Sequence, residues 1–249
     1  RKTTVPHSAH APPSAANGEP MTISRGTRIT NALALALSLI ALASLTACAI
    51  PELIGGMAES ARLTGSTTVP AEYKGLKSKT WAVVTLAPRG VQYEVPNLVT
   101  ATTNATTRKL VDAQNEGVLG SAGFLPGPEV LLLQSTSPSF NAWSFRRMGE
   151  ELGVERLIVI DVSHLQLYER GNALLWDGAI AARVGVVEVE TGASDFAYQK
   201  DISITYPDEA AWSTDDLPKR HVVSVLLDRL SDRAAWLFFE HEEPNVIEY

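Results

Sequence analysis

Cysteine is almost absent from this chain of 249 residues, which contains Cys48 and no other. An intramolecular disulfide is therefore excluded, and the folded part must be stabilised by hydrophobic burial. If Cys48 is covalently modified, no thiol is left for nucleophilic or redox catalysis. About 200 residues remain after the N-terminal segments described below, and a domain of that size can bury a substantial core.

Basic residues are also scarce, because 21 lysines and arginines are set against 28 aspartates and glutamates, a net charge of −7. Four basic residues and one acidic residue precede Cys48, so the rest of the chain carries 17 and 27, a net charge of about −10. An acidic surface repels phosphate backbones, so nucleic acid is not an expected partner. The composition also offers no polybasic patch for anionic lipid headgroups, so membrane association would require an anchor.

No apolar run reaches the length of a membrane span. Residues 32–47 make about 16 residues or about 24 Å of helix, short of a hydrocarbon core of about 30 Å. This run follows Met21, Arg25 and Arg28. A positive segment, a hydrophobic segment and a site of small residues are the parts of a secretory signal peptide, so residues 21–47 are predicted to be one.

The signal ends in Leu45-Thr46-Ala47-Cys48, which resembles the lipobox of bacterial lipoproteins. The resemblance implies that the Cys48 thiol is diacylated and that the chain is cut just before it. Cys48 then becomes the first residue of the mature protein. A pair of acyl chains holds a protein stably on a membrane, whereas one chain binds marginally. Ala49, in place of aspartate, favours the outer membrane over the inner membrane by the same resemblance.

Two other interpretations of this segment stay open. An ordinary signal peptide fits, because residues 47–49 read small-x-small and cleavage would fall before Ile50. An uncleaved anchor is the other, although the run is short and no charge cluster follows it. Residues 1–20 are rich in alanine, proline and serine without apolar periodicity, and are interpreted as a disordered leader or as an upstream misassigned start.

Composition divides the remainder into three parts. Residues 48–78 contain glycine and proline at high density and are predicted to be a tether that carries the lipid. Residues 79–240 hold the regular apolar patterns and are predicted to form a single α/β domain. Residues 241–249 are predicted to be an acidic tail.

The domain is predicted to be a mixed parallel and antiparallel sheet with helices packed on it, in the order β-α-β-α-β-β-β-α. The continuous run Leu157 to Ile160 is typical of a strand covered on both faces. Alternating helices and strands in the first half predict parallel pairing, and a turn around Gly192 predicts an antiparallel hairpin. The predicted strands are 81–86, 130–134, 156–167, 174–190 and 196–206, and the predicted helices are 96–119, 139–152 and 219–240.

Catalytic signatures are missing from the sequence. It has no nucleophile elbow, no phosphate-binding glycine-rich loop and no dinucleotide fingerprint. The chain is therefore predicted not to be an enzyme and to need no metal or cofactor beyond the lipid on Cys48. Glu188 and Glu190 could form a carboxylate pair, but an exposed charged face of an edge hairpin is preferred. His241 and its acidic neighbours could bind a metal, but a solvated charge run is preferred.

The tryptophans give one candidate for contact with a partner. Trp143 and Trp236 fall at helix-core spacing and are predicted to be buried. Trp212 lies in the acidic loop 207–218 and is the candidate exposed contact.

Four segments together carry a family resemblance. They are the strand 81–86, the run Met148-Gly-Glu-Glu-Leu-Gly-Val-Glu-Arg-Leu-Ile-Val-Ile160, the turn Val189-Glu-Thr-Gly192 and the last amphipathic helix. With them the chain resembles periplasmic lipoproteins built on the TolB amino-terminal-like domain, including the curli secretion lipoprotein and lipoprotein activators of penicillin-binding proteins. The resemblance implies a non-enzymatic accessory protein of the cell envelope, a scaffold or activator that binds an envelope protein. A lipoprotein that binds a small ligand or an envelope polymer is the alternative. The acidic tail and the loop 207–218 depart from the group, so the partner and the oligomeric state stay open.

Overall fold

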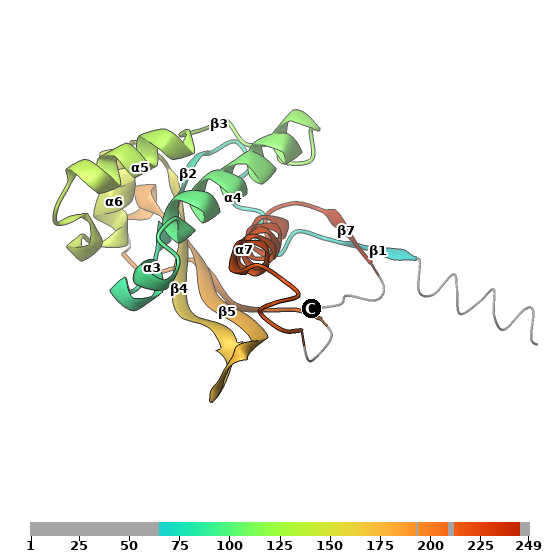
Figure 1. The fold of residues 1–249 in the computed structure, drawn as a ribbon. Helices are drawn as coiled ribbons and strands as arrows, with labels where there is room; N and C mark the ends of the chain where they lie inside the picture. The colour runs from blue at the N-terminus through green and yellow to red at the C-terminus, as the bar shows by residue number, and fades with distance from the viewer. Residues whose placement is uncertain (1–64, 193, 209–211, 245–249) are drawn as a thin grey trace, which may run out of the picture. The chain divides into compact units, whose positions relative to one another are not determined.

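The computed structural model describes residues 65–192, 194–208 and 212–244. These residues include a mixed sheet of five strands with helices packed on both faces, which confirms the predicted α/β class (Figure 1). The strand order is β3-β2-β4-β5-β6. The strands are β2 (Thr80–Leu86), β3 (Gly123–Phe124), β4 (Arg156–Glu169), β5 (Asn172–Glu188) and β6 (Tyr198–Tyr206).

The pairing changes direction across the sheet, as the order of elements predicts. β2 pairs in parallel with β3 and with β4, and helices connect these strands. β4, β5 and β6 then form an antiparallel meander. Gly171 and Gly192 lie in the two turns of the meander with φ of +84° and +74°, a conformation that glycine adopts without strain.

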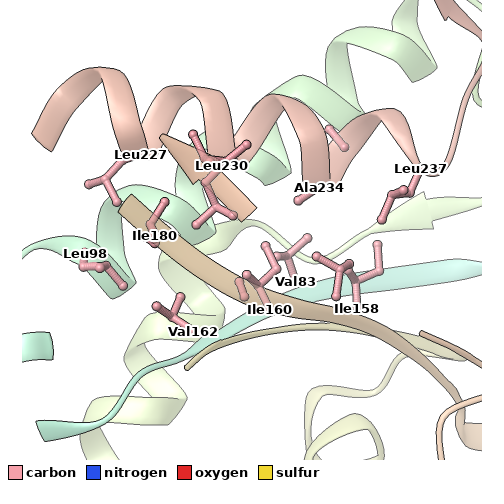
Figure 2. Packing of buried hydrophobic residues seen from close by; sticks show 14 of the residues in the cluster. Val83, Leu98, Ile158, Ile160, Val162, Ile180, Leu227, Leu230, Ala234 and Leu237 are labelled. Atoms are coloured by element: carbon pink, nitrogen blue, oxygen red, sulfur yellow. The ribbon is translucent and has the colours of Figure 1, made fainter. Parts of the chain in front are cut away.

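Apolar side chains cover both faces of the central strands. Ile158, Ile160 and Val162 of β4 point to one face, and Leu157 and Val159 point to the other, as the continuous apolar run predicts. The first face packs against α4 (Leu98–Asn115) and α7 (Lys219–Trp236), as Figure 2 shows. The second packs against α5 (Gly127–Thr136) and α6 (Phe145–Leu152). Each aliphatic side chain buried this way contributes about 1.5–3 kcal/mol.

Helix α7 lies very close to the sheet. An ideal Cβ at Gly178 of β5 would lie 2.3 Å from the carbonyl oxygen of Tyr206, 3.0 Å from Leu226 and 3.2 Å from Val222. Glycine at this position therefore permits the close approach of β5, β6 and α7. The predicted helix 219–240 is confirmed, although the α-helix ends at Trp236.

Helix α4 confirms the predicted helix 96–119, and its buried face is rich in threonine. Thr102, Thr103 and Thr106 are fully buried. The Thr103 hydroxyl donates to the Thr85 hydroxyl of β2 at 2.9 Å, which ties the helix to the sheet by a polar contact inside the core.

The predicted strand 130–134 is wrong, because this segment lies in helix α5. Pro128 occupies the first turn and Glu129 follows it, and both favour a helix start. The run from Leu131 to Leu133 is unbranched at Cβ, so it suits a helix better than a strand. The parallel neighbour of β2 is instead the two-residue strand β3.

The predicted helix 139–152 is divided in two. Phe140–Ala142 forms a 3₁₀ turn, and α6 begins after Ser144, whose hydroxyl accepts the Arg147 N–H at 3.3 Å. Gly153 ends α6 with φ of +67°, as expected for a glycine after a helix. A short helix not predicted from the sequence, α3 (Arg89–Glu94), precedes α4.

The fold begins before residue 79, where the sequence placed the start of the domain. β1 (Ser66–Val69) pairs antiparallel with β7 (His241–Pro244). Tyr73 and Leu76 are also buried in the core. Residues 66–78 of the predicted tether and residues 241–244 of the predicted tail therefore belong to the folded structure. The polar sequences of β1 and β7 gave no periodic signal, and each depends on a strand far away in the chain. Within the described ranges, no helix has the length and apolar character needed to cross a membrane.

Candidate functional site

Of the two residues assigned a role from the sequence, one lies outside the described structure. Cys48 falls in residues 1–64, so its lipidation stays a prediction. Trp212 is 39% exposed, and its carbonyl accepts the Trp176 N–H at 2.9 Å, which holds the end of the acidic loop against β5. Leu174, on the same part of β5, is 69% exposed. Contact of Trp212 with a partner stays a prediction.

Trp143 and Trp236, predicted to be buried, are only half-buried. The Arg147 guanidinium lies over the Trp143 ring at 4.5 Å, and the His241 ring stacks on Trp236 at 4.8 Å. Cationic and aromatic partners thus cover ring surface that the core does not cover. Trp81 and Trp176 are the buried tryptophans of the described core.

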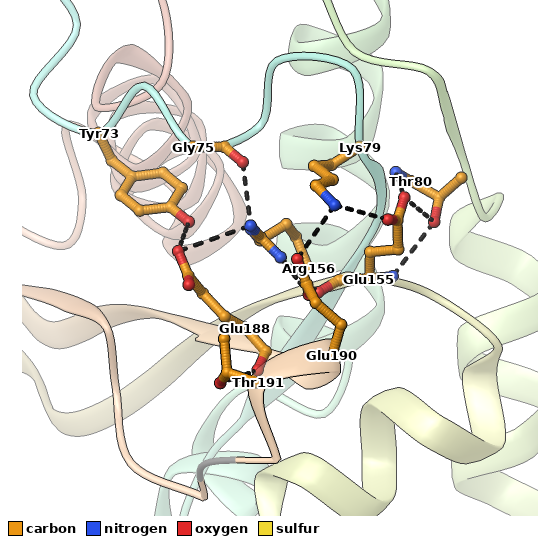
Figure 3. Close-up of polar contacts among 9 residues, drawn as sticks. All are labelled: Tyr73, Gly75, Lys79, Thr80, Glu155, Arg156, Glu188, Glu190 and Thr191. Atoms are coloured by element: carbon orange, nitrogen blue, oxygen red, sulfur yellow. Dashed lines mark hydrogen bonds and ion pairs between the residues drawn. The ribbon is translucent and has the colours of Figure 1, made fainter.

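The carboxylates of Glu188 and Glu190 meet at a buried arginine, as Figure 3 shows. Arg156, the first residue of β4, is paired across the sheet with Glu188, the last residue of β5. Its side chain is 7% exposed, and the two glutamate side chains are 28% and 38% exposed. Glu190 is exposed, as expected, and Glu188 is half-buried, but the β4–β5 register also sets a cation between the two acids.

The Arg156 guanidinium has partners on several sides. Nε donates to the carbonyl of Gly75 at 3.1 Å, and Nη1 donates to the carbonyl of Glu155 at 3.0 Å. Nη1 also pairs with Glu190, and Nη2 lies 3.6 Å from Glu188. Because Nε and Nη1 donate to oxygens and Nη2 lies near a carboxylate, the cost of burying the charge is offset by charge-assisted contacts.

Lys79 extends the cluster to the start of β2. Its ammonium lies 2.8 Å from Glu155 and 3.1 Å from Glu190. The other Glu155 oxygen accepts the Thr80 N–H at 3.0 Å, and the Thr80 hydroxyl accepts the Glu155 N–H at 3.1 Å. The hydrogen bonds from Lys79 and Thr80 lower the pKa of Glu155 below its ordinary value.

Tyr73 closes the cluster on the N-terminal side. Its hydroxyl donates to Glu188 at 3.0 Å, and burial together with this hydrogen bond raises the pKa of Tyr73 to about 12. The hydrogen bond from Arg156 lowers the pKa of Glu190 to about 2. Glu190 is thus held ionised and Tyr73 neutral at neutral pH, so neither group is poised to transfer a proton.

The arrangement of these residues suits a mechanical role. Tyr73, Gly75, Lys79 and Thr80 belong to the segment that leads into β2, and their partners lie at the start of β4 and the end of β5. We call this set of contacts the arginine clamp. It holds the N-terminal segment against the end of the sheet, and backbone hydrogen bonds from Glu72 and Tyr73 to the Leu237 carbonyl, at 3.0 and 2.9 Å, add to it.

His241, considered above as a metal ligand, has protein partners instead. Besides stacking on Trp236, its Nδ1 lies 3.1 Å from the carbonyl oxygen of Phe239 and its Nε2 lies 3.3 Å from Glu243. Among the residues that the structure describes, no three His, Cys, Asp or Glu side chains are grouped as a metal site requires.

A small cavity of about 210 Å³ lies between β6, the β1–β7 pair and the end of α7. Charged side chains line it, and they pair with one another: Glu72 with Lys200, and Arg233 with Glu243. Sites for small organic ligands usually measure about 300–1,000 Å³. The cavity is below that range, and its charges are already compensated.

Sequence reasoning found Glu188 and Glu190 but missed Arg156 and Tyr73. A charged residue at the first position of an otherwise apolar strand was a usable signal for Arg156. Its pairing with Glu188 was not predictable, because it depends on the register of β4 and β5. That register contains several irregularities between Val162 and Glu169, so it cannot be counted from the turn. No local pattern marked Tyr73, because it precedes the first predicted strand.

The described part of the chain defines a mixed α/β protein with a clamped N-terminal segment. No protein-family model matches the chain, and no curated protein matches it. Among solved structures it is similar to a dodecameric PelC variant from Paraburkholderia phytofirmans, with 10% identity over 69% of this chain and 96% of that chain, at a TM-score of 0.39. It is also similar to lipoprotein GNA1162 from Neisseria meningitidis, with 13% identity over 61% and 98% of the two chains, at a TM-score of 0.38. Likenesses at such low scores carry no argument about this chain, and membership of the TolB-like group stays a prediction.

Proposed function

We propose that this protein is a lipid-anchored accessory protein of the cell envelope that acts by binding another protein. The observation that carries the proposal is the order of residues 21–48: a basic segment, a short apolar run and Leu-Thr-Ala before Cys48. That order suits lipidation at Cys48 and a location on the periplasmic side of a membrane, with Ala49 favouring the outer one.

The clamped N-terminal segment supports the anchoring role. If the domain were joined to the membrane by a loose tether alone, the residues just after the tether would not need to contact the domain. Here residues 66–80 pair with β7, enter the core and bind Arg156. About 17 residues separate Cys48 from Ser66, so the anchor and the folded part can be at most about 60 Å apart along the chain.

The chemistry of the polar clusters supports binding in preference to catalysis. The Arg156, Lys79 and Glu155 groups are paired with each other or with backbone. The alternative function, binding of a small ligand or an envelope polymer, gains no support from the cavity beside β6, because its volume is about 210 Å³ and its charges are paired.

Metabolic labelling tests the anchor. Cells that express the full chain are fed radiolabelled palmitate, and the intact mass of the membrane-extracted protein is measured. We expect label on the wild-type protein, a mature N-terminus at Cys48, and no label on Cys48→Ala. A mature chain that begins at Ile50 without lipid, or label retained by Cys48→Ala, contradicts the proposal.

A further inference from the structure

Helices α4 and α7 pack on the same face of the sheet, and together they line a groove. α4 and α7 run in the same direction, because ion pairs join them at matching ends. Lys219 at the start of α7 pairs with Glu94, just before α4. Near the other end, Lys109 of α4 lies 3.1 Å from Asp228 and 2.5 Å from Asp232.

The outer side of this helix pair holds a groove of about 790 Å³. This volume lies within the usual range of binding sites, unlike the cavity beside β6. Small and aliphatic side chains, Ala101, Ala105, Val223 and Leu227, line it together with polar ones. The polar residues are Asn97, Asn104, Arg108, Arg220, Ser224 and Asp228.

Arg108 and Arg220 bring two positive charges to this groove. Both are exposed, and within the described residues neither has an ion pair or a hydrogen-bonding side-chain partner. The neighbouring Lys109 is shared by Asp228 and Asp232, so the charge of Asp228 is offset only in part by its own chain. In a chain with a net charge of −7, two uncompensated arginines in one groove mark a local site for negative charge.

We propose that the groove binds an acidic amphipathic helix of a partner protein, an inference that rests on the proposed protein-binding function. Alanines at 101 and 105 lie one turn apart on α4, so a third helix can approach closely and place its apolar side chains between α4 and α7. Lys109, beside Arg108, pairs with Asp228 and Asp232, which follow Arg220 on α7 by eight and twelve positions. Arg220 and Arg108 therefore lie about 16 Å apart along the groove, which matches carboxylates roughly three helical turns apart.

The lining favours a helix over an acidic polysaccharide. Arginine recognises carboxylates by a bidentate pair in either case. The four aliphatic side chains between the arginines offer apolar surface for leucine or alanine, which a polysaccharide does not use. Asn97, Asn104 and Ser224 also offer hydrogen bonds to sugar hydroxyls, so an acidic polysaccharide is the competing ligand in the test.

The test uses a defined probe and the full-length protein purified in detergent. The probe is a fluorescent 18-residue alanine- and leucine-based helix with two glutamates eleven positions apart on its polar edge. Binding is followed by fluorescence anisotropy at low salt. We expect Arg108→Glu/Arg220→Glu to bind at least about tenfold more weakly, and Arg108→Lys/Arg220→Lys to retain part of the affinity.

A matched control separates the groove from overall charge. Arg89 and Arg170 are also exposed and have no partner among the described residues, and they lie outside the groove. Arg89→Glu/Arg170→Glu makes the same change in net charge and should bind the probe as the wild type does. A probe with lysine in place of glutamate should not bind.

Three results overturn the inference: equal binding by the wild type and the groove variant, equal loss in the control variant, or arginine-dependent binding of polygalacturonate in the absence of peptide binding. Lipidation at Cys48 is measured on the same preparation. An unlipidated chain that binds the probe contradicts the proposed anchoring alone, and a lipidated chain that ignores the probe contradicts the groove alone.

Discussion

This protein has two arginine sites, and they differ in whether the arginine is paired within its own chain. Arg156 is buried, and its guanidinium meets two carboxylates and two backbone carbonyls of its own chain. Arg108 and Arg220 are exposed on a pair of helices, and the described residues supply no partner for them. The first site has its counter-charges inside the fold, whereas the second lacks them.

The difference shows how the same side chain serves two purposes. A buried cation must be paired by its own chain, since an unpaired one would unfold the protein. A surface cation has no such requirement, because water solvates it at little cost. An unpaired surface arginine in a groove is therefore available to an external anion, and an arginine in the clamp is not.

The largest expected effect is at the clamp. Arg156→Ala removes the buried cation, so Glu188 keeps only the Tyr73 hydroxyl and Glu190 keeps only Lys79 as side-chain partners among those described. We expect the free energy of unfolding to fall by about 2–4 kcal/mol, measured by urea denaturation of the purified full-length chain. Arg183→Ala, which breaks an exposed pair with Asp201 at 2.8 Å, should cost less than about 1 kcal/mol. Equal losses in the two variants would remove the distinction between buried and exposed arginines.

A smaller effect is expected at the tyrosine that joins the N-terminal segment to the clamp. Tyr73→Phe keeps the ring near Phe238, at 6.1 Å between centroids, but removes the hydrogen bond to Glu188. We expect a loss of about 1 kcal/mol, together with faster proteolysis between residues 66 and 80. Tyr93→Phe changes a side chain that is 89% exposed, and it should have no effect on either measurement.

The clamp also predicts a dependence of stability on pH. The pKa of Glu190 is lowered to about 2 from an ordinary value of 4.5, so its ionised form stabilises the fold above that ordinary value. This contribution is lost as the pH falls from about 4.5 toward 2. The melting temperature, measured by thermal unfolding at several pH values across this range, should fall less steeply with decreasing pH for Glu190→Gln than for the wild type. Parallel curves would show that Glu190 is not stabilised by Arg156.

The smallest effect on stability is expected in the groove. Arg108→Glu/Arg220→Glu changes exposed side chains that hold no described contact, so the free energy of unfolding should change by less than about 0.5 kcal/mol. Urea denaturation of this variant and of Arg156→Ala under the same conditions compares their free energies of unfolding. A loss as large as that of Arg156→Ala would mean that the groove arginines are structural.

The sequence predicted the parts of the fold that depend on local patterns. The run Leu157 to Ile160 and the period of α7 correspond to a strand buried on both faces and to a helix. Helix α5 was misassigned because a short leucine-rich segment has no period that separates helix from strand. β1 and β7 were missed because each is short and polar and is defined by the other.

The candidate site was predicted only in part, for the same reason. The spacing of Glu188 and Glu190 was visible, but Arg156 and Tyr73 come to them from other parts of the chain. The groove was invisible, because it requires knowing that α4 and α7 lie side by side. Trp212 was recognisable from its acidic loop, which does not depend on tertiary pairing.

The position of the clamp has a consequence for a protein held by its N-terminus. If Cys48 is fixed in a membrane and a partner pulls on the domain, the load travels along the backbone from β1 toward β2. It reaches the hydrogen bonds of Glu72, Tyr73 and Gly75 before it reaches Thr80, where β2 begins. Those bonds pass the tension to the end of α7 and to β4, so β2 is protected from being peeled away from the sheet.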